Sequence, residues 1–346
     1  MASTLGNSAL WLSFLFSVLQ FIVSTRNNNT IIIFNRIAVT GLLASTLASF
    51  FLLMYCHVTS DFSVINVFQN SHTTKPLLYK ISGVWGNHEG SMLLWMLVLS
   101  ITNYFIFKLY NKNNYIFVSK TLQIQAVIII GFLLFILITS NPFETMSVVP
   151  SNGLGFNPIL QDPALAIHPP LLYIGYVGLS AVFSLSIATM NSENDKGIPW
   201  YTYMKPFVVA AWTFLTAGIA LGSIWAYYEL GWGGFWFWDP VENVSLMPWL
   251  CLTALLHTIV VLEKRLILQS WTLILSIATF TFSMSGTFLV RSGILNSVHT
   301  FANDPERGIF ILIFLFVLIS LSLIIFFFYQ TKELSEKKIF WLSKET

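Results

Sequence analysis

The sequence predicts an all-α, polytopic integral membrane protein with about nine transmembrane helices. Two of the observations behind this prediction concern composition: only 9% of the 346 residues are charged, and 55% are hydrophobic, with a mean hydropathy of +0.73. An ordinary globular protein is about one quarter charged, so these charged side chains are too few to solvate a soluble surface. The composition therefore excludes a soluble enzyme or a soluble binding module.

The third observation is a series of nine apolar runs, each close to the roughly 20 residues that cross a bilayer as a helix. Backbone groups in lipid need hydrogen-bond partners within their own segment, so each run is expected to be helical. We expect residues 1–329 to form one transmembrane domain and residues 330–346 to form a short tail on the inner side. The runs lie near residues 8–24, 37–56, 91–108, 121–140, 170–190, 206–225, 244–262, 270–290 and 308–329.

Charge placement predicts the orientation of these spans. The first run has no Lys or Arg before it and has Arg26 after it, which is the reverse of a cleaved signal peptide. We therefore expect a retained helix with its N-terminus outside. The connections after spans 1, 3, 5, 7 and 9 contain 13 of the 17 basic residues, so the positive-inside rule places them on the inner face.

The formal net charge of only +2 hides an asymmetry between the two faces. The inner face has 13 basic and 6 acidic residues, whereas the outer face has 4 basic and 9 acidic residues. Because the chain lacks a large basic excess, we expect no nucleic-acid partner. The two cysteines, Cys56 and Cys251, each lie in an apolar run, where packing is the expected role. They cannot build a disulfide framework, a CxxC redox pair or a cysteine zinc cluster.

The outer connections, near residues 57–90, 141–169, 226–243 and 291–307, are longer than the inner ones and contain most of the histidines. Of the six histidines in the chain, five lie in these connections and one, His257, lies inside the seventh run. There it serves either as a functional group or as a partner in a helix–helix hydrogen bond, and both interpretations stay open. The five histidines in the outer connections are His57, His72, His88, His168 and His299.

The most unusual segment is Trp225 to Trp249, which reads WAYYELGWGGFWFWDPVENVSLMPW. It has eight aromatic residues in the fourteen positions from Trp225 to Trp238, more than an interfacial aromatic belt requires. Glycines at 231, 233 and 234 bring bare backbone to the same place. We favour a shelf for a flat, apolar ligand over a belt, and we expect Asp239 to act as an N-terminal cap for the next helix.

Haem is the flat ligand that the neighbouring loops indicate. His168 and His299 flank the shelf on the same predicted face and can supply two axial ligands to iron, although isolated histidines often have structural roles. Arg291, eight residues before His299, can pair with a propionate. The chain has neither an HExxH zinc motif nor a CxxCH haem-attachment motif, so it is not itself a c-type cytochrome.

Five motifs resemble, in order, those of the CcmF family of cytochrome c maturation haem lyase subunits, which carry a tryptophan-rich "WWD" motif. The likeness extends from about residue 60 to residue 345. In chain order the motifs are WGNHEGSMLLW at 85–95, IHPPLLYIGYVG at 167–178, WGGFWFWDPVENVSLMPWL at 232–250, ALLHTIVVLEKR at 254–265 and VRSGILNSVH at 290–299.

The resemblance implies roles for residues that match the family motifs. His168 and His299 match two outward-facing histidines that ligate the iron of the incoming haem. His257 matches a membrane histidine that ligates a resident haem b. The sequence differs from the usual WWD motif at Phe235, where family members more often have Trp. No role is assigned to His88 and Glu89, and His57 and His72 are interpreted as ordinary loop residues. The shelf itself corresponds to Trp232, Gly233, Gly234, Trp236, Trp238 and Asp239.

The resemblance also implies cofactors, partners and a location. The chain is expected to be part of a thioether-forming haem lyase complex, with no catalytic residue of its own. Expected partners are a CcmE-type haem chaperone, apocytochrome c, a CcmH-type partner that handles its thiols, and a separate chain carrying the C-terminal half of CcmF. Split versions of the family occur in plant-type mitochondria, and richness in Phe, Ile and Asn fits an AT-rich organellar genome. The resemblance therefore implies the mitochondrial inner membrane, with the haem site facing the intermembrane space; the alternative is a bacterial inner membrane with the site facing the periplasm.

Two other function classes compete with this interpretation. A transporter or haem exporter with an aromatic gating loop predicts charged or broken helices near the middle of the membrane, where only His257 is found. A structural respiratory-chain subunit predicts neither clustered outer histidines nor a glycine–tryptophan shelf.

Overall fold

The computed structural model describes residues 1–25, 31–109, 114–191, 199–231, 236–292 and 305–332. Within these ranges it has nine helices that are long and apolar enough to cross a membrane, which confirms the predicted fold class. Each helix contains one of the predicted runs, except that α6 ends one residue before the run near 121–140 does. They are α1 (Ala2–Ser24), α2 (Ile31–Thr59), α5 (His88–Lys108), α6 (Tyr115–Thr139), α7 (Pro163–Asn191), α8 (Trp200–Glu229), α9 (Pro240–Arg265), α10 (Gln269–Arg291) and α11 (Pro305–Lys332).

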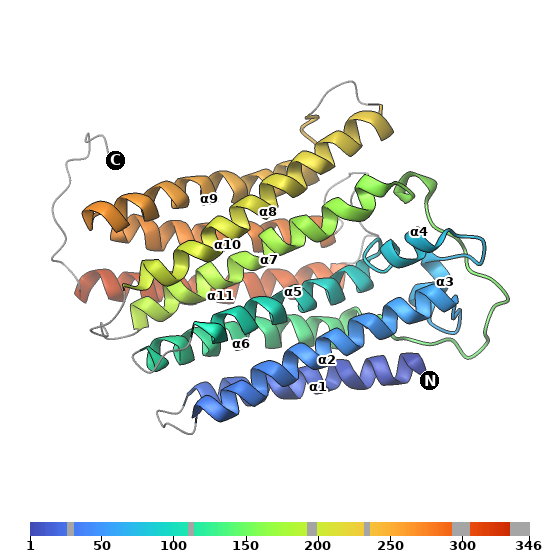
Figure 1. Ribbon diagram of the computed structural model, residues 1–346, viewed down its shortest axis with the longest axis horizontal. Coiled ribbons are helices and arrows are strands. Elements are labelled where there is room, and N and C mark those ends of the chain that lie inside the picture. Colours follow the sequence, from blue (N-terminus) through green and yellow to red (C-terminus); the bar gives the residue numbers. More distant parts are fainter. Residues whose placement is uncertain (26–30, 110–113, 192–198, 232–235, 293–304, 333–346) are drawn as a thin grey trace.

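The nine helices lie side by side and alternate in direction, as Figure 1 shows. Two short helices, α3 (Ile65–Asn70) and α4 (Leu77–Ser82), lie at the same end of the bundle as the N-terminus. We call this the loop end. A short 3₁₀ helix, η1 (Pro158–Leu160), interrupts the connection between α6 and α7. Because α5, α7, α9 and α11 begin at the loop end and α2, α6, α8 and α10 finish there, motifs far apart in the chain meet at this end.

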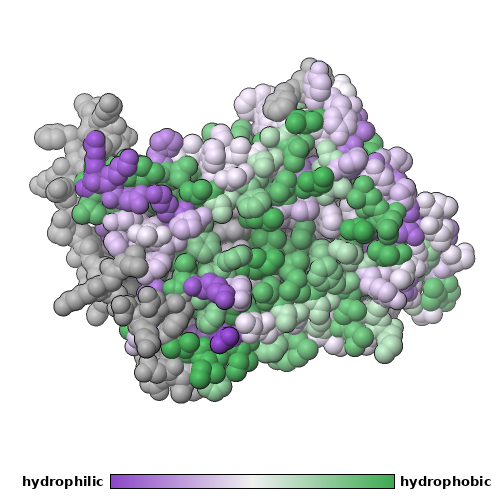
Figure 2. Space-filling view, in the orientation of Figure 1, coloured by the Kyte–Doolittle hydropathy of each residue, from purple (hydrophilic) through white to green (hydrophobic). Residues whose placement is uncertain are grey.

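The described basic residues of the predicted inner face lie at the opposite end of the bundle. Arg36 is in the second turn of α2, Lys108 ends α5 and Arg265 ends α9, with Lys120 and Lys205 near the starts of α6 and α8. On the face seen in Figure 2, hydrophobic residues cover the middle and hydrophilic residues lie toward the two ends. The helix topology is therefore consistent with the alternation on which the positive-inside prediction depends.

Close packing between α7 and α8 holds the centre of the bundle together. These two helices make the most extensive contact of any pair, and α7 also packs against α5, α6, α10 and α11. Gly175 faces the α8 backbone, and a Cβ atom there would lie 2.6 Å from the nitrogen of Leu215. Small residues allow such close approach in membranes, where burial from water does not drive helices together.

Polar side chains join other helix pairs inside the apolar bundle. Gln20 of α1 and Asn103 of α5 exchange two hydrogen bonds, at 2.9 Å and 2.7 Å, and both residues are fully buried. A buried amide without a hydrogen-bond partner costs free energy. A shift of α1 along α5 would break both hydrogen bonds, so this reciprocal pair also fixes the register of the two helices.

Candidate functional site

A cavity of about 530 Å³ opens between α5, α7, α8, α9 and α10 at the loop end. Its size lies within the range of pockets that bind small molecules and cofactors. Four tryptophans line it, and the Trp95 and Trp236 indole N–H groups and the Tyr176 hydroxyl have no hydrogen-bond partner among the described residues. Such a site suits an aromatic, largely apolar ligand with a few acceptor groups. The lining tryptophans are Trp85, Trp95, Trp225 and Trp236.

His168 lies on the wall of this cavity, in the second turn of α7. Asp162 caps the start of the helix, because its Oδ1 accepts from the backbone nitrogens of Ala164 at 2.7 Å and Leu165 at 3.1 Å. The Nδ1 of His168 donates to the Ala164 carbonyl at 3.1 Å. A carbonyl only accepts, so Nδ1 carries the proton and Nε2 carries the lone pair that a metal requires.

Two neighbours fix the plane of the His168 ring. The ring lies against Trp225, with centroids 6.0 Å apart and planes inclined by 30°. On the α8 side, a Cβ atom at Gly222 would lie 3.3 Å from the ring, so the glycine makes room for the imidazole. The histidine is thus buried and oriented by the protein itself.

The two prolines after His168 create an anchoring point for α7. A proline has no N–H, so Pro169 and Pro170 leave the carbonyls of Leu165 and Ala166 without their usual helical donors. The indole N–H of Trp85 donates to the Ala166 carbonyl at 3.1 Å. The tryptophan that begins the WGNHEG motif therefore holds the segment containing His168 in place.

The described part of the tryptophan-rich segment ends in a rigid cap. Asp239 and Glu242 form a capping box at the start of α9, which confirms the predicted N-cap role of Asp239. The Oε2 of Glu242 accepts from the backbone nitrogens of Phe237 and Asp239, both at 3.1 Å. Trp236 lines the cavity, whereas Trp238 is 70% exposed and has a positive φ of 61°. Trp232, Gly233, Gly234 and Phe235 lie outside the described residues.

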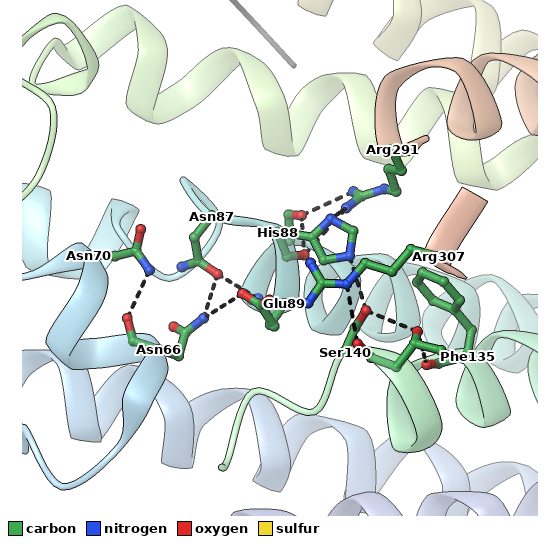
Figure 3. A network of polar contacts seen from close by, with 12 residues as sticks. Asn66, Asn70, Asn87, His88, Glu89, Phe135, Ser140, Arg291 and Arg307 are labelled. Atoms are coloured by element: carbon green, nitrogen blue, oxygen red, sulfur yellow. Dashed lines mark hydrogen bonds and ion pairs between the residues drawn. The ribbon is translucent and has the colours of Figure 1, made fainter. Parts of the chain in front are cut away.

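Arg291, the last residue of α10, is 3% exposed and lines the cavity. Its guanidinium donates to the Nδ1 of His88 at 3.1 Å and to the Ser91 hydroxyl at 3.0 Å, both on α5. A further hydrogen bond of 3.2 Å reaches the Tyr173 hydroxyl on α7. This one side chain therefore connects three helices at the cavity wall, and Figure 3 shows its contact with His88.

Glu89, beside His88, belongs to a second part of the same polar network (Figure 3). Its carboxylate pairs with Arg307 of α11 at 3.0 Å and accepts from the Asn66 amide at 3.2 Å. The Oδ1 of Asn66 in turn contacts the Nε2 of His57 at 2.9 Å. The interpretation of His57 as an ordinary loop residue is wrong, because it lies in the last turn of α2 and is fully buried.

Lys75, in the connection between α3 and α4, supports the rim of the cavity. Its ammonium lies 3.5 Å from the centroid of the Phe156 ring, and Phe156 lines the cavity. It also donates to the Asn70 carbonyl at 3.0 Å. Burial lowers the pKa of Lys75 to about 7, and the nearby charge of Lys80 acts in the same direction.

His257 does not belong to the cavity. It lies on α9, is exposed on the surface of the bundle, and its Nδ1 donates to the Thr253 carbonyl at 2.7 Å. The structure thus brings His168, Trp236 and Arg291 together and leaves His257 apart; His299 lies outside the described residues. Trp85 and Tyr173 were not predicted as site residues, although both lie within the motifs singled out in the sequence.

Comparison with known proteins links these features to a family. The family model described as "Cytochrome C assembly protein" matches residues 85–296, which include His168, the tryptophan-rich segment and Arg291. A solved structure named "Cytochrome c Heme Lyase CcmF" superposes with a TM-score of 0.80 at 29% identity, over 94% of this chain and 51% of that chain.

Curated relatives are more similar in sequence. The chain is 56% identical to the cytochrome c-type biogenesis protein ccl1 of Rhodobacter capsulatus, over 80% of this chain and 42% of the relative. It is 51% identical to CycK of Bradyrhizobium diazoefficiens (92% and 48%) and 46% identical to CcmF of Escherichia coli (92% and 49%). The chain therefore spans about half the length of the relatives that it matches.

Proposed function

Because this chain belongs to the cytochrome c assembly protein family, we propose that it is the haem-binding part of a membrane haem lyase for c-type cytochromes. The observation that carries the proposal is the tryptophan-lined cavity with His168 on its wall. In this proposal haem is the substrate, delivered by a CcmE-type chaperone and held in the cavity until it is joined to the CxxCH cysteines of an apocytochrome c.

The residues of the cavity suit a porphyrin. Trp225 and Trp236 offer flat apolar surfaces, and the lone pair of His168 Nε2 provides one axial ligand. His299 is proposed as the second axial ligand, and Trp232, Gly233 and Gly234 as the rest of the shelf. The motif residues Trp238 and Asp239 complete the segment, and Asp239 forms the capping box with Glu242 at the start of α9. Arg291 binds a propionate.

The chemistry requires orientation more than a nucleophile from this chain. In each of the two attachment steps a cysteine thiol adds across a haem vinyl group: a carbon–sulfur bond forms, and the thiol hydrogen goes to the other vinyl carbon. The thiols come from the apocytochrome, kept reduced by a CcmH-type partner. Holding the ring fixed while the vinyl groups stay accessible supplies the effective concentration that accelerates such an addition.

His257 is proposed as a residue that would hold a resident haem b, a group whose chemistry would be to supply electrons to the transferred iron. Its ring could hold such a haem, because Nδ1 donates to the Thr253 carbonyl at 2.7 Å, which leaves the lone pair on Nε2 as the group that would bind iron. The ring is exposed on the bundle surface, where a histidine facing lipid is costly. The half of the longer relatives that this chain does not span would supply the second ligand and cover this face.

The proposed function also predicts which membrane contains the protein and which side the loop end faces. Richness in Phe, Ile and Asn fits an AT-rich mitochondrial genome, and the mitochondrial inner membrane would place the loop end toward the intermembrane space. The bacterial relatives favour its counterpart, the bacterial inner membrane with the loop end facing the periplasm. Both locations put the cavity on the side where c-type cytochromes receive haem.

A complementation experiment tests the proposed function. This chain, produced together with the C-terminal half of the E. coli relative as a second chain, is introduced into E. coli cells that lack that relative. We expect covalent haem to return to a periplasmic reporter cytochrome c, because the two proteins are 46% identical over 319 residues. Haem staining of the denatured reporter measures attachment, and the membrane content of b-type haem controls for haem supply. A reporter without covalent haem, in cells whose membranes contain both chains, would contradict the proposal.

A further inference from the structure

The WGNHEG motif contains a histidine that the proposed function does not use. His88 is 6% exposed, at the start of α5, and both of its ring nitrogens are engaged. Its Nε2 lies 3.0 Å from the Ser140 hydroxyl and its Nδ1 lies 3.1 Å from the Nη1 of Arg291. Figure 3 shows the ring between these two partners. A histidine held on both sides in this way cannot also ligate iron.

The partners of His88 determine its protonation state. A guanidinium has only donors, so the Nδ1 beside Arg291 must be the unprotonated acceptor. The proton of the neutral ring is therefore on Nε2, which donates to the Ser140 hydroxyl. A second proton on the ring would direct an N–H group at the guanidinium and place two positive charges in contact. His88 is thus a neutral acceptor with one fixed tautomer.

The other contacts of Arg291 place its charge on the cavity wall. Nη1 also donates to the His88 carbonyl at 3.3 Å, and Nη2 donates to Ser91 and Tyr173. These acceptors are all neutral groups, and together they orient the guanidinium on the cavity wall. The neighbouring carboxylate, Glu89, pairs with Arg307 at 3.0 Å. A cation on the wall of a mostly apolar cavity favours an anionic group of the ligand there.

We propose that His88 is a positioning residue that directs Arg291 to bind a carboxylate of the ligand in the cavity. The proposal rests on the proposed function, since haem has two carboxylates on one edge. With that edge at the wall formed by α5 and α10, the vinyl groups lie on the side of the ring away from Arg291. His88 would then determine which edge of the porphyrin the apocytochrome meets.

Haem and haem dimethyl ester, which lacks both free carboxylates, separate this role from a structural one. Binding of each is measured by absorbance titration of the purified full chain with its partner chain. The wild type is expected to bind haem about tenfold or more tightly than the ester, the size of one charge-assisted hydrogen bond. In His88→Phe the ratio of the affinities for haem and ester is expected to fall toward one, because phenylalanine keeps an aromatic ring at this position but has no acceptor for Arg291.

Three variants make the test specific. Arg291→Gln is expected to lose the preference in the same way, and His88→Asn to retain part of it, since the amide oxygen can accept in place of Nδ1. Arg307→Lys is the matched control: it lies in the same network, keeps the charge opposite Glu89 and is expected to retain the preference. A purely structural role for His88 predicts that His88→Phe weakens haem and ester equally.

The outcomes distinguish this inference from the proposed function. A wild type that binds haem and ester equally well, or a His88→Phe variant that keeps the preference, would overturn the inference and leave haem binding intact. A wild type that binds neither compound would overturn the proposed function and this inference with it.

Discussion

Replacing His168 with alanine is expected to remove haem from the outer site and to stop covalent attachment to the apocytochrome. His168 is the buried histidine on the cavity wall, and its Nε2 lone pair is the proposed iron ligand. Loss of a group that only orients a metal ligand typically costs about 10–100-fold in affinity, so loss of the ligand itself is expected to cost at least about 100-fold. His299→Ala is expected to have the same effect.

Visible absorption of the purified complex, titrated with haem, measures this loss. His72→Ala provides the control, because His72 is another loop-end histidine and does not line the cavity. Its Nδ1 is hydrogen-bonded to the hydroxyl and the backbone nitrogen of Thr74, at 2.7 Å and 3.2 Å. It is expected to bind haem like the wild type. An unchanged haem spectrum in both His168→Ala and His299→Ala would refute the assignment of the two axial ligands.

Gly175→Ala is the second change with a large expected effect, this time on folding. The added Cβ atom would lie 2.6 Å from the Leu215 nitrogen and 2.8 Å from the Ala211 carbonyl oxygen, both in the α8 backbone. Backbone atoms cannot rotate away as side chains do, so α7 and α8 would have to separate. Overpacking of this kind costs about 1–3 kcal/mol or more in the free energy of unfolding. Separation would also move His168 relative to Gly222.

Gly178→Ala is the matched control on the same helix. A Cβ atom at Gly178 meets nothing within 4 Å, and alanine in a helix interior is more stable than glycine by up to about 1 kcal/mol. Thermal unfolding in detergent and the fraction of monodisperse protein are compared for the two variants. If Gly175→Ala proves as stable as Gly178→Ala, the close α7–α8 approach is not important for folding.

The transmembrane helices were predictable because their signal is local. Each span needs only a run of apolar residues, and the structure confirms all nine within the described ranges. Local chemistry also predicts the Asp239 cap, since the Asp-Pro-x-Glu pattern is itself the start of a helix. The short helices α3 and α4 were missed because six residues are too few for a periodic pattern.

The cavity wall could not be predicted, since its contacts join distant parts of the chain. His88 and Arg291 are 203 positions apart, and Glu89 and Arg307 are 218 apart. Each motif was recognisable alone, but the sequence does not indicate that His88 of WGNHEG accepts a hydrogen bond from Arg291 of VRSG. The prediction for His57 failed for a different reason: its partner Asn66 is only nine positions away, but it lies on a short helix that the sequence pattern did not reveal.

The most direct test of the central claim is an electron cryomicroscopy structure of the chain and its partner chain purified with haem bound. We expect a flat density in the cavity, against Trp225 and Trp236, with the iron coordinated by the Nε2 of His168 and one edge of the ring at Arg291. A haem found elsewhere in the complex while this cavity holds none would contradict the proposed haem site.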